Sequence, residues 1–276
     1  MVLGMDEIPV KSWTEFETEL QKLREEIGES GSPVLFRGQA DASWPLSTTL
    51  ERSGSEDMRF SDYYQLITAA IRPAVATLSS AGPNIPEYDG ELEGLLKQED
   101  SEVFRRFPPM PLYEYMVYLR HHGFPSPLLD WSHSPYVAAF FAFREPMRAP
   151  GQRAVYAFCE MPHGHKGGWS AGPRIRQIGS YVRSHRRHFQ QQSDYTICGL
   201  HDKWWRFHSH DAMFSSPQRY RDQDLLWKFV LPSIERLTFL RILDRFNINA
   251  FSLFGSEETL METVALRELI LKPRTA

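Results

Sequence analysis

The fold is decided by the stretch His121-His122-Gly123-Phe124-Pro125-Ser126-Pro127-Leu128-Leu129-Asp130-Trp131-Ser132-His133-Ser134-Pro135-Tyr136-Val137-Ala138-Ala139-Phe140-Phe141-Ala142-Phe143. Gly123 tolerates a left-handed backbone, which predicts that a helix ends at His121-His122. Pro125 and Pro127 favour extended conformations around them. The apolar pair Leu128-Leu129 has the size of a short buried strand segment. The sequence therefore predicts a helix, an extended turn and a buried strand in succession.

A second helix follows this strand. Ser134 and Pro135 are the residue types of an N-cap and a first helical position. Apolar residues then fill nearly every position to Phe143, which is typical of a buried helix. Asp130 and Ser132 thus stand between a buried strand and a buried helix, where a carboxylate is costly unless it is paired or hydrogen-bonded. Two interpretations stay open: Asp130 caps the helix beside a core Trp131, or Asp130 takes part in a site.

Length, charge and cysteine content limit the class of protein. A chain of 276 residues can hold one large or two modest domains. Its net charge of −4 argues against a nucleic-acid footprint over the whole protein. Cys159 and Cys198 make no disulfide framework, and their apolar neighbours predict buried free thiols, which suit a reducing cytoplasm. No signal pattern and no bilayer-length apolar run is present, so we expect a cytoplasmic protein without membrane contact.

Another polar group follows a short strand near the N-terminus. Residues 33–36 read as this strand, and Arg37-Gly38-Gln39 comes directly after it. An arginine in this position needs an anionic partner, and its planar fork suits a carboxylate or a phosphate. Gly38 permits close approach of a ligand or of backbone. The alternative is a structural ion pair between Arg37 and an aspartate such as Asp130.

The rest of the chain predicts an α+β fold, with a mixed, mainly antiparallel central sheet and surrounding helices. Ser12 and Glu15 form a capping-box pattern that opens an amphipathic helix ending near Gly28. Further strands are expected at 154–158, 195–198 and 225–231, and further helices at 112–121, at 234–246 and after Ser256. The polar cluster 190–194 enters the strand 195–198, another position suited to a site.

Two charged segments stand apart from this pattern. Residues 79–100 are rich in Gly, Pro, Asp and Glu and predict an exposed acidic excursion, a candidate lid or variable insertion. Residues 174–188 contain five arginines and no acid, which predicts either an anion-attracting patch or an ordinary solvated face. His163 and His165 lack the tight Cys/His spacing of a zinc site, so we predict no metal.

Two motifs resemble the signatures of the FRG domain, named for its Phe-Arg-Gly tripeptide. Phe36-Arg37-Gly38-Gln39 resembles the first, with Trp44-Pro45-Leu46 behind it. The run from His121 to Ser132 and the Ala-rich helix after it resemble the second, Gln-His-x-Gly-x-x-Thr-x-Leu-Leu-Asp-Trp-Thr/Ser. Arg120-His121 and Ser126 depart from that pattern. The resemblance implies a single FRG-type domain over residues 1–276, with a core of about 13–267 and the excursion at 79–100.

A second resemblance is to ADP-ribosyltransferases of the Arg–Ser–Glu type. Arg37 stands where these enzymes have an arginine at the end of a first strand. Asp130-Trp131-Ser132 stands where Ser-Thr-Ser would, and Gln192-Ser193-Asp194 where Gln-x-Glu would. Only Arg37 and Ser132 match in identity, and the catalytic Glu is missing. The resemblance implies an ADP-ribosyltransferase-like core.

The same resemblance implies a site that takes NAD as its substrate. Cleavage of the nicotinamide–ribose bond passes through an oxocarbenium-like state, which an enzyme stabilises with a nearby anion. The implied catalytic residues are Arg37, Asp130, Ser132, Gln192 and Asp194. The implied nucleotide-binding residues are Arg37, Gly38, Gln39, His122 and Trp131.

The expected function is that of a toxin or phage-defence effector, either an ADP-ribosyltransferase or an NAD glycohydrolase. Its acceptor would be a protein or a nucleic acid, the latter held by Arg183, Arg186 and Arg187. Two alternatives stay open. The cleft could belong to a non-catalytic module that binds a nucleotide or another anion in a stress or defence system. The chain could also be a protein-interacting domain that meets its partner through the acidic excursion.

Overall fold

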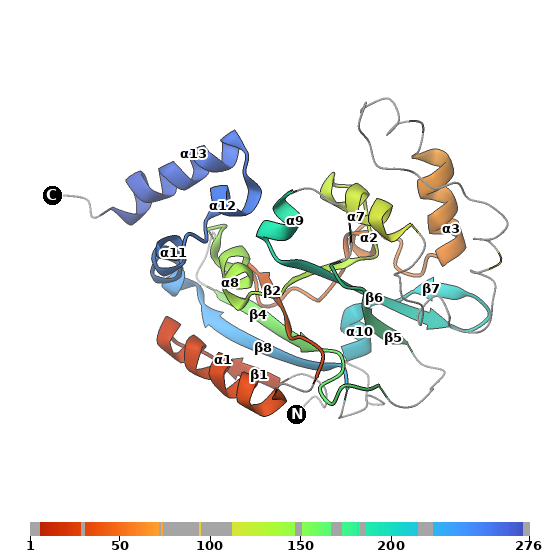
Figure 1. The fold of residues 1–276 in the computed structure, drawn as a ribbon, viewed down its shortest axis with the longest axis horizontal. Coiled ribbons are helices and arrows are strands. Elements are labelled where there is room, and N and C mark those ends of the chain that lie inside the picture. Colours follow the sequence, from red (N-terminus) through yellow and green to blue (C-terminus); the bar gives the residue numbers. More distant parts are fainter. Residues whose placement is uncertain are drawn as a thin grey trace.

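The computed structural model describes residues 6–28, 31–71, 73, 94, 112–146, 151–166, 173–180, 182, 186–214 and 223–272, and every structural statement below concerns these residues. They form one eight-stranded sheet with the strand order β1-β8-β4-β2-β3-β6-β5, and β7 pairs with β6 (Figure 1). The strands are β1 (Asp6–Pro9), β2 (Leu35–Gln39), β3 (Leu129–Ser132), β4 (Gln152–Cys159), β5 (Arg174–Gln177), β6 (Ser193–His201), β7 (Trp205–Phe207) and β8 (Leu225–Pro232). The pair β1–β8 is parallel and the other pairs are antiparallel, so the predicted α+β class with a mainly antiparallel sheet is confirmed.

Helices surround this sheet. The described α-helices are α1 (Trp13–Ile27), α2 (Thr49–Arg52), α3 (Phe60–Gln65), α7 (Tyr113–His121), α8 (Pro135–Phe143), α9 (Arg186–Gln190), α10 (His210–Phe214), α11 (Arg236–Arg245), α12 (Ala250–Phe254) and α13 (Glu257–Ala265). Short π-helical segments, η1 (Leu66–Ala70) and η3 (Leu266–Leu271), extend α3 and α13, and a 3-10 turn, η2 (Ser233–Glu235), precedes α11. None of the described helices is long and apolar enough to span a bilayer.

Local capping chemistry sets the start of α8. The Ser134 hydroxyl accepts the backbone N–H of Val137 at 3.3 Å, and Pro135 is the first helical residue. Ser134 therefore caps α8 as predicted, and the interpretation of Asp130 as the cap is wrong. At α1 the Ser12 hydroxyl accepts the N–H of Glu15, but the carboxylate of Glu15 accepts from Lys11 instead of closing the capping box.

Helix α8 packs directly on β2, and α1 and α11 share its core. Apolar residues of the three helices share one core cluster with Phe36 and with the same-face residues of β4 and β8. A Cβ added to Gly38 would stand 1.9 Å from the carbonyl oxygen of Ala138 and 2.6 Å from the nitrogen of Ala142. The glycine at this position is therefore required by the close approach of helix backbone.

Helices α3 and α7 cover the other half of the sheet. They form a second cluster with Tyr195 and Ile197 of β6, while Trp131 lies with Leu35 in a third cluster on the opposite face. Among the described residues, β2 and β3 are paired at one position, Phe36 with Ser132. The sheet therefore opens beyond this pair, between the part covered by α8 and the part covered by α7.

Some predictions about the fold were incomplete. The expected strands 154–158, 195–198 and 225–231 correspond to longer strands β4, β6 and β8, whereas β1, β5 and β7 were not predicted. Residues 174–177 of the basic segment form β5, an edge strand. Cys159 and Cys198 are buried free thiols, as predicted. The acidic excursion 79–100 lies, apart from Gly94, outside the described residues.

Candidate functional site

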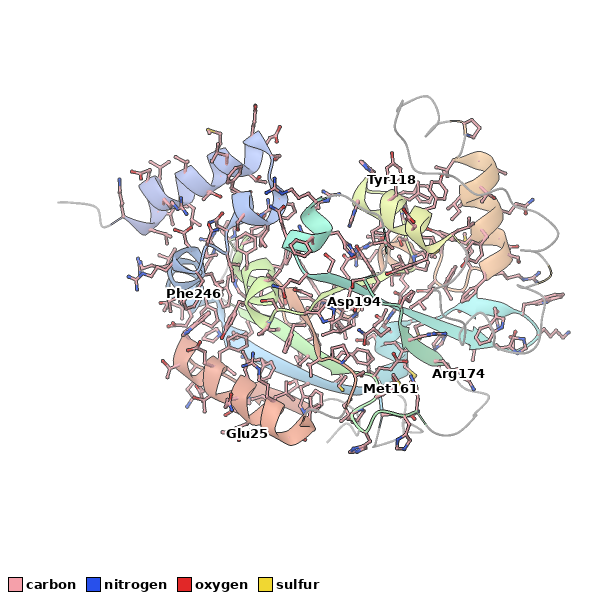
Figure 2. The ribbon with its side chains drawn as sticks, viewed as in Figure 1. Glu25, Tyr118, Met161, Arg174, Asp194 and Phe246 are labelled. Atoms are coloured by element: carbon pink, nitrogen blue, oxygen red, sulfur yellow. The ribbon has the colours of Figure 1, made fainter. Side chains whose placement is uncertain are left out.

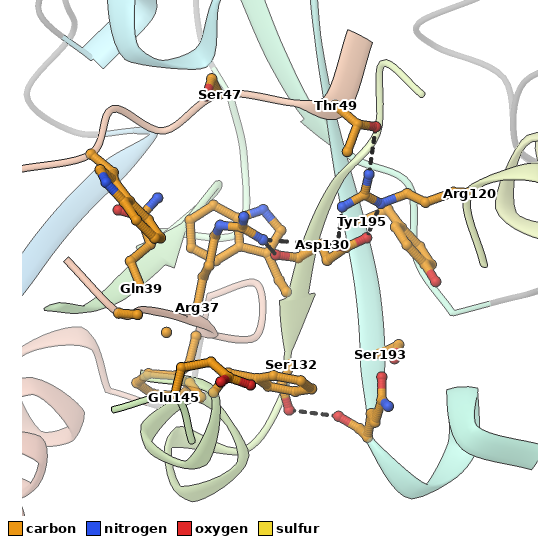
Figure 3. A pocket seen from close by; sticks show the side chains of 18 of the residues that line it. Arg37, Gln39, Ser47, Thr49, Arg120, Asp130, Ser132, Glu145, Ser193 and Tyr195 are labelled. Atoms are coloured by element: carbon orange, nitrogen blue, oxygen red, sulfur yellow. Dashed lines mark hydrogen bonds and ion pairs between the residues drawn. The ribbon is translucent and has the colours of Figure 1, made fainter. Parts of the chain in front are cut away.

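A cleft of about 1220 Å³ opens where β2 and β3 separate. Its walls come from these two strands, from the loop after β2, from α7 and from α8 (Figure 3). The polar and charged side chains that line it are Arg37, Gln39, Asp41, Ser47, Thr49, Arg52, Arg120, His121, Asp130, Ser132, Glu145, Arg187, Gln191, Ser193 and Tyr195. Aromatic and apolar lining comes from Phe36, Trp44, Pro45, Trp131, Ala138, Phe141 and Phe254. The volume and mixed lining suit a ligand of nucleotide size.

Arg37 lies in the opening between the two strands. Its Nη1 donates to the backbone carbonyl of Asp130 at 2.8 Å, while the nearest carboxylate oxygen of Asp130 is 3.9 Å away. No described residue accepts a hydrogen bond from its buried Nε. Burial lowers the pKa of Arg37 to about 10, although Asp130 raises it, so the guanidinium is charged at neutral pH. Because a neutral carbonyl does not compensate a positive charge, the guanidinium of Arg37 can still pair with an anion.

The carboxylate of Asp130 is paired with Arg120 and not with Arg37. Nε and Nη2 of Arg120 donate to its two oxygens, and Nη1 of Arg120 donates to the hydroxyl of Thr49 at 2.8 Å. Burial opposes ionisation of Asp130, but the charge and hydrogen bonds of Arg120 outweigh it and lower the pKa of the carboxyl. No role in the site was predicted for Arg120. The ion pair between Arg37 and Asp130, one of the alternatives considered from the sequence, is present only as the 3.9 Å contact between Nη1 and a carboxylate oxygen.

Further cationic groups surround this pair. Arg52 donates to the carbonyl of Ser47 at 2.6 Å, and Arg187 donates to the carbonyl of His121. The imidazole Nε2 of His121 is 3.0 Å from the hydroxyl of Tyr195. Burial and the charge of Arg187 lower the pKa of His121 to about 4, so this histidine is neutral at pH 7. Four arginines thus line the cleft with three carboxylates, Asp41, Asp130 and Glu145.

Two polar side chains at the cleft have defined local tasks. The Ser132 hydroxyl donates to the carbonyl of Gln191 at 2.7 Å and accepts the N–H of Ser134 at 3.0 Å, which fixes the turn from β3 into α8. The Gln39 amide donates to the carbonyl of Pro45 at 3.2 Å. Gln39 is 6 % exposed, and its Oε1 has no hydrogen-bond donor among the described residues. This oxygen and Nε of Arg37 are buried polar atoms that a bound ligand can satisfy.

Three of the predicted site residues lie elsewhere. Alternation along β6 turns Ser193 and Tyr195 toward the cleft and Asp194 away from it. Asp194 is 1 % exposed and accepts from Gln177 at 2.7 Å and from the N–H of Gly179 at 3.0 Å (Figure 2). Gln192 and His122 are exposed and are not in the cleft lining.

Each of these three positions has a structural reason. The oxygens of Asp194 hold the end of β5, and one also lies 3.1 Å from Nε2 of His133. Gln192 has a φ of 48° at the entry of β6, and its carbonyl accepts the N–H of His133 at 2.9 Å. His122 follows the end of α7 and packs against Tyr118. It is His121, one residue earlier, that faces the cleft.

The described arginines of the basic segment, residues 174–188, do not form one patch at the cleft. Arg183 lies outside the described residues. Arg186 and Arg187 belong to α9, and only Arg187 lines the cleft. The described part of the chain has no group of three or more His, Cys, Asp or Glu side chains arranged for a metal ion.

The two signature motifs supply the centre of this cleft. Arg37, Gly38 and Gln39 come from the first, and Asp130, Trp131 and Ser132 from the second. The family model of the FRG domain matches residues 32–150. The chain contains an FRG domain. No curated protein and no solved structure matches the chain significantly.

The FRG match covers less than half of the chain. It includes most of the residues that line the cleft, from β2 and the segment after it, α7, β3, α8 and the turn after α8, whereas β4, β6 and β8 come after it. The extent of a single FRG-type domain over residues 1–276 stays a prediction. Within the FRG domain, Arg120 is the main site residue that sequence reasoning missed. The available signal was an arginine in the last turn of a largely apolar helix.

Proposed function

We propose that the FRG cleft binds an anionic nucleotide. The observation that carries this proposal is Arg37, a charged side chain at the cleft whose guanidinium is anchored to a carbonyl and whose Nε is unpaired within the described residues. A planar guanidinium in this state suits a phosphate. Arg52 and Arg187 add positive charge nearby, and Asp130 is already neutralised by Arg120.

The apolar wall of the cleft favours a nucleotide over a simple anion. Trp44 is 55 % exposed and lines the cleft together with Pro45 and Phe141. Nucleobases stack on exposed aromatic faces, with a gain of about 1–3 kcal/mol per base. The unpaired Oε1 of Gln39 needs a donor, which an exocyclic amine or a carboxamide can provide.

A second candidate function is cleavage of NAD, as expected from the resemblance to ADP-ribosyltransferases. The observation that favours it is a carboxylate at the cleft: Glu145 lines it with a side chain that is 71 % exposed. Such an anion can stabilise an oxocarbenium-like state next to a bound nicotinamide ribose. Asp130 is less suited to this task because Arg120 holds both of its oxygens.

Titration calorimetry with NAD and with ADP tests the binding function. We expect both nucleotides to bind, and Arg37→Ala to weaken binding about thirtyfold, because a charge-assisted hydrogen bond contributes about 2 kcal/mol. Arg267→Ala is the matched control, since Arg267 forms a bidentate pair with Asp244 away from the cleft lining. Failure of wild type to bind either nucleotide, or equal affinity after Arg37→Ala, contradicts the proposal.

A nicotinamide-release assay separates the two candidates. Binding of NAD without release supports a non-catalytic module. Release that is lost in both Arg37→Ala and Glu145→Gln supports NAD cleavage in this cleft. Release at equal rates in wild type and Arg37→Ala removes the catalytic candidate.

A further inference from the structure

We propose that Arg120 is a positioning residue that neutralises Asp130 and thereby keeps the charge of Arg37 available to an anion in the cleft. This inference rests on the nucleotide-binding function proposed above and assigns a task within it. It concerns a position where the chain departs from the second FRG signature, on the last turn of α7.

Hydrogen bonds from all three guanidinium nitrogens fix the side chain of Arg120. Nε and Nη2 hold the two carboxylate oxygens of Asp130, and Nη1 donates to Thr49. Thr49 is itself fixed, because its hydroxyl accepts the N–H of Ser126 at 2.9 Å. The side chain of Arg120 is 10 % exposed. The bidentate geometry therefore fixes the orientation of the Asp130 carboxylate relative to β3 and the cleft (Figure 3).

Without Arg120, the nearest cation to Asp130 would be Arg37. Nη1 of Arg37 is already 3.9 Å from one carboxylate oxygen of Asp130. A released carboxylate can close this distance by rotating its side chain. It would then occupy the guanidinium that an anionic ligand needs, and its negative charge would repel the same ligand.

The anchor of Arg37 does not depend on this carboxylate. Arg37 donates to the backbone carbonyl of Asp130, a group that the substitution Asp130→Asn leaves in place. The charge of Asp130 can therefore be removed without removing the contact that orients Arg37. Loss of Arg120 and loss of the Asp130 charge should for this reason have opposite effects on anion binding.

The test is a double-mutant cycle on the full chain, with ADP as the probe and titration calorimetry as the readout. We expect Arg120→Ala to weaken ADP binding at least about tenfold. Asp130→Asn alone should bind ADP at least as tightly as wild type. The double variant Arg120→Ala/Asp130→Asn should recover to within about threefold of wild type. Thermal unfolding of each variant is measured in parallel, so that binding is compared only between folded proteins.

The matched control is the pair Arg267 and Asp244, which has the same bidentate geometry outside the cleft lining. Arg267→Ala should leave ADP binding unchanged. Where Arg120→Ala does not fold, Arg120→Gln takes its place, since it keeps a donor for Thr49 but lacks the charge. A folded double variant that binds ADP as weakly as the Arg120 single variant overturns the inference, because a purely structural Arg120 gives that result. Wild-type affinity after loss of Arg120 also overturns it, whereas absence of ADP binding by wild type contradicts the proposed function instead.

Discussion

Two arginines of this protein, the partly buried Arg37 and the fully buried Arg153, differ in what surrounds them. Burial lowers the pKa of each to about 10, and each leaves Nε without an acceptor among the described residues. Arg153 is completely buried and donates to the carbonyls of Ala142 and Glu145 at the end of α8. Its guanidinium also lies over the ring of Phe143. Arg37 instead borders an open cleft.

The comparison shows that a buried cation is not by itself evidence of a site. Arg153 is part of the packing, because it donates to carbonyls in the last turn of α8 and just after it, and it is not among the residues that line the cleft. Arg37 has the same chemistry and the same shift of pKa, but a cavity of ligand size lies next to it. The empty space beside the charge is the feature that favours binding.

The largest effect on stability is expected at Gly38. This residue follows Arg37 in the sequence, but its role is in packing, like that of Arg153. Gly38→Ala places a Cβ 1.9 Å from the backbone oxygen of Ala138, so α8 must move away from β2. We expect the free energy of unfolding to fall by at least about 3 kcal/mol, measured by urea denaturation.

The control for this substitution is Gly28→Ala. Gly28 has a φ of 68°, and no described heavy atom lies within 4 Å of an added Cβ. Only backbone strain acts there, and because its ψ of −167° belongs to a region that almost only glycine adopts, a loss of about 1–2 kcal/mol is expected. Equal losses at the two glycines would contradict the tight packing of α8 on β2.

A smaller effect separates the two arginines themselves. Arg153→Met leaves two carbonyls at the end of α8 without their donor, so we expect a loss of about 2–3 kcal/mol in the free energy of unfolding. Arg37→Met should change this quantity by less than about 1 kcal/mol, because removing a buried charge offsets the loss of one hydrogen bond. Urea denaturation of both variants checks this order. The reverse order would show that Arg37 is the structural residue.

The smallest effect concerns pH. The pKa of Asp130 in the folded protein is below its usual value of 3.8, because Arg120 outweighs the effect of burial. A lowered pKa of a carboxyl contributes stability above the usual value, and this contribution is lost as pH falls through the folded value. The difference in unfolding free energy between wild type and Asp130→Asn should therefore be constant near neutral pH, and wild type should lose stability relative to the variant as pH approaches 3.8 and falls below it. Urea denaturation at a series of pH values measures it, and a difference that changes between pH 5 and 7 would contradict this assignment.

Local signals in the sequence predicted the parts of the fold that depend on neighbouring residues. Ser134 and Pro135 start α8, and Gly123 has the expected positive φ of 86° after α7. The strand β1, Asp-Glu-Ile-Pro, was missed because it is short, polar and at the edge of the sheet. Its place depends on its parallel pairing with β8, more than 200 residues away, and no local pattern encodes that pairing.

The site was predicted in part for the same reason. Arg37, Asp130 and Ser132 were expected to meet, and they line one cleft. The sequence did not reveal that Arg120, rather than Arg37, holds the carboxylate, because this depends on how α7 lies against β3. Asp194 was expected in the site because it enters a strand, but the alternation of β6 sends its side chain to the other face.

The single residue pair that joins β2 to β3 has a practical consequence. On either side of Phe36 and Ser132, the sheet consists of two multi-stranded portions whose described backbones share little direct pairing. A molecule lodged in the cleft would touch both portions and bridge them. Since any compound that binds only the folded chain raises its melting temperature, by an amount that grows as the ligand concentration exceeds the Kd, a thermal-shift screen of unlabelled metabolites can discover the natural ligand without assuming its chemistry.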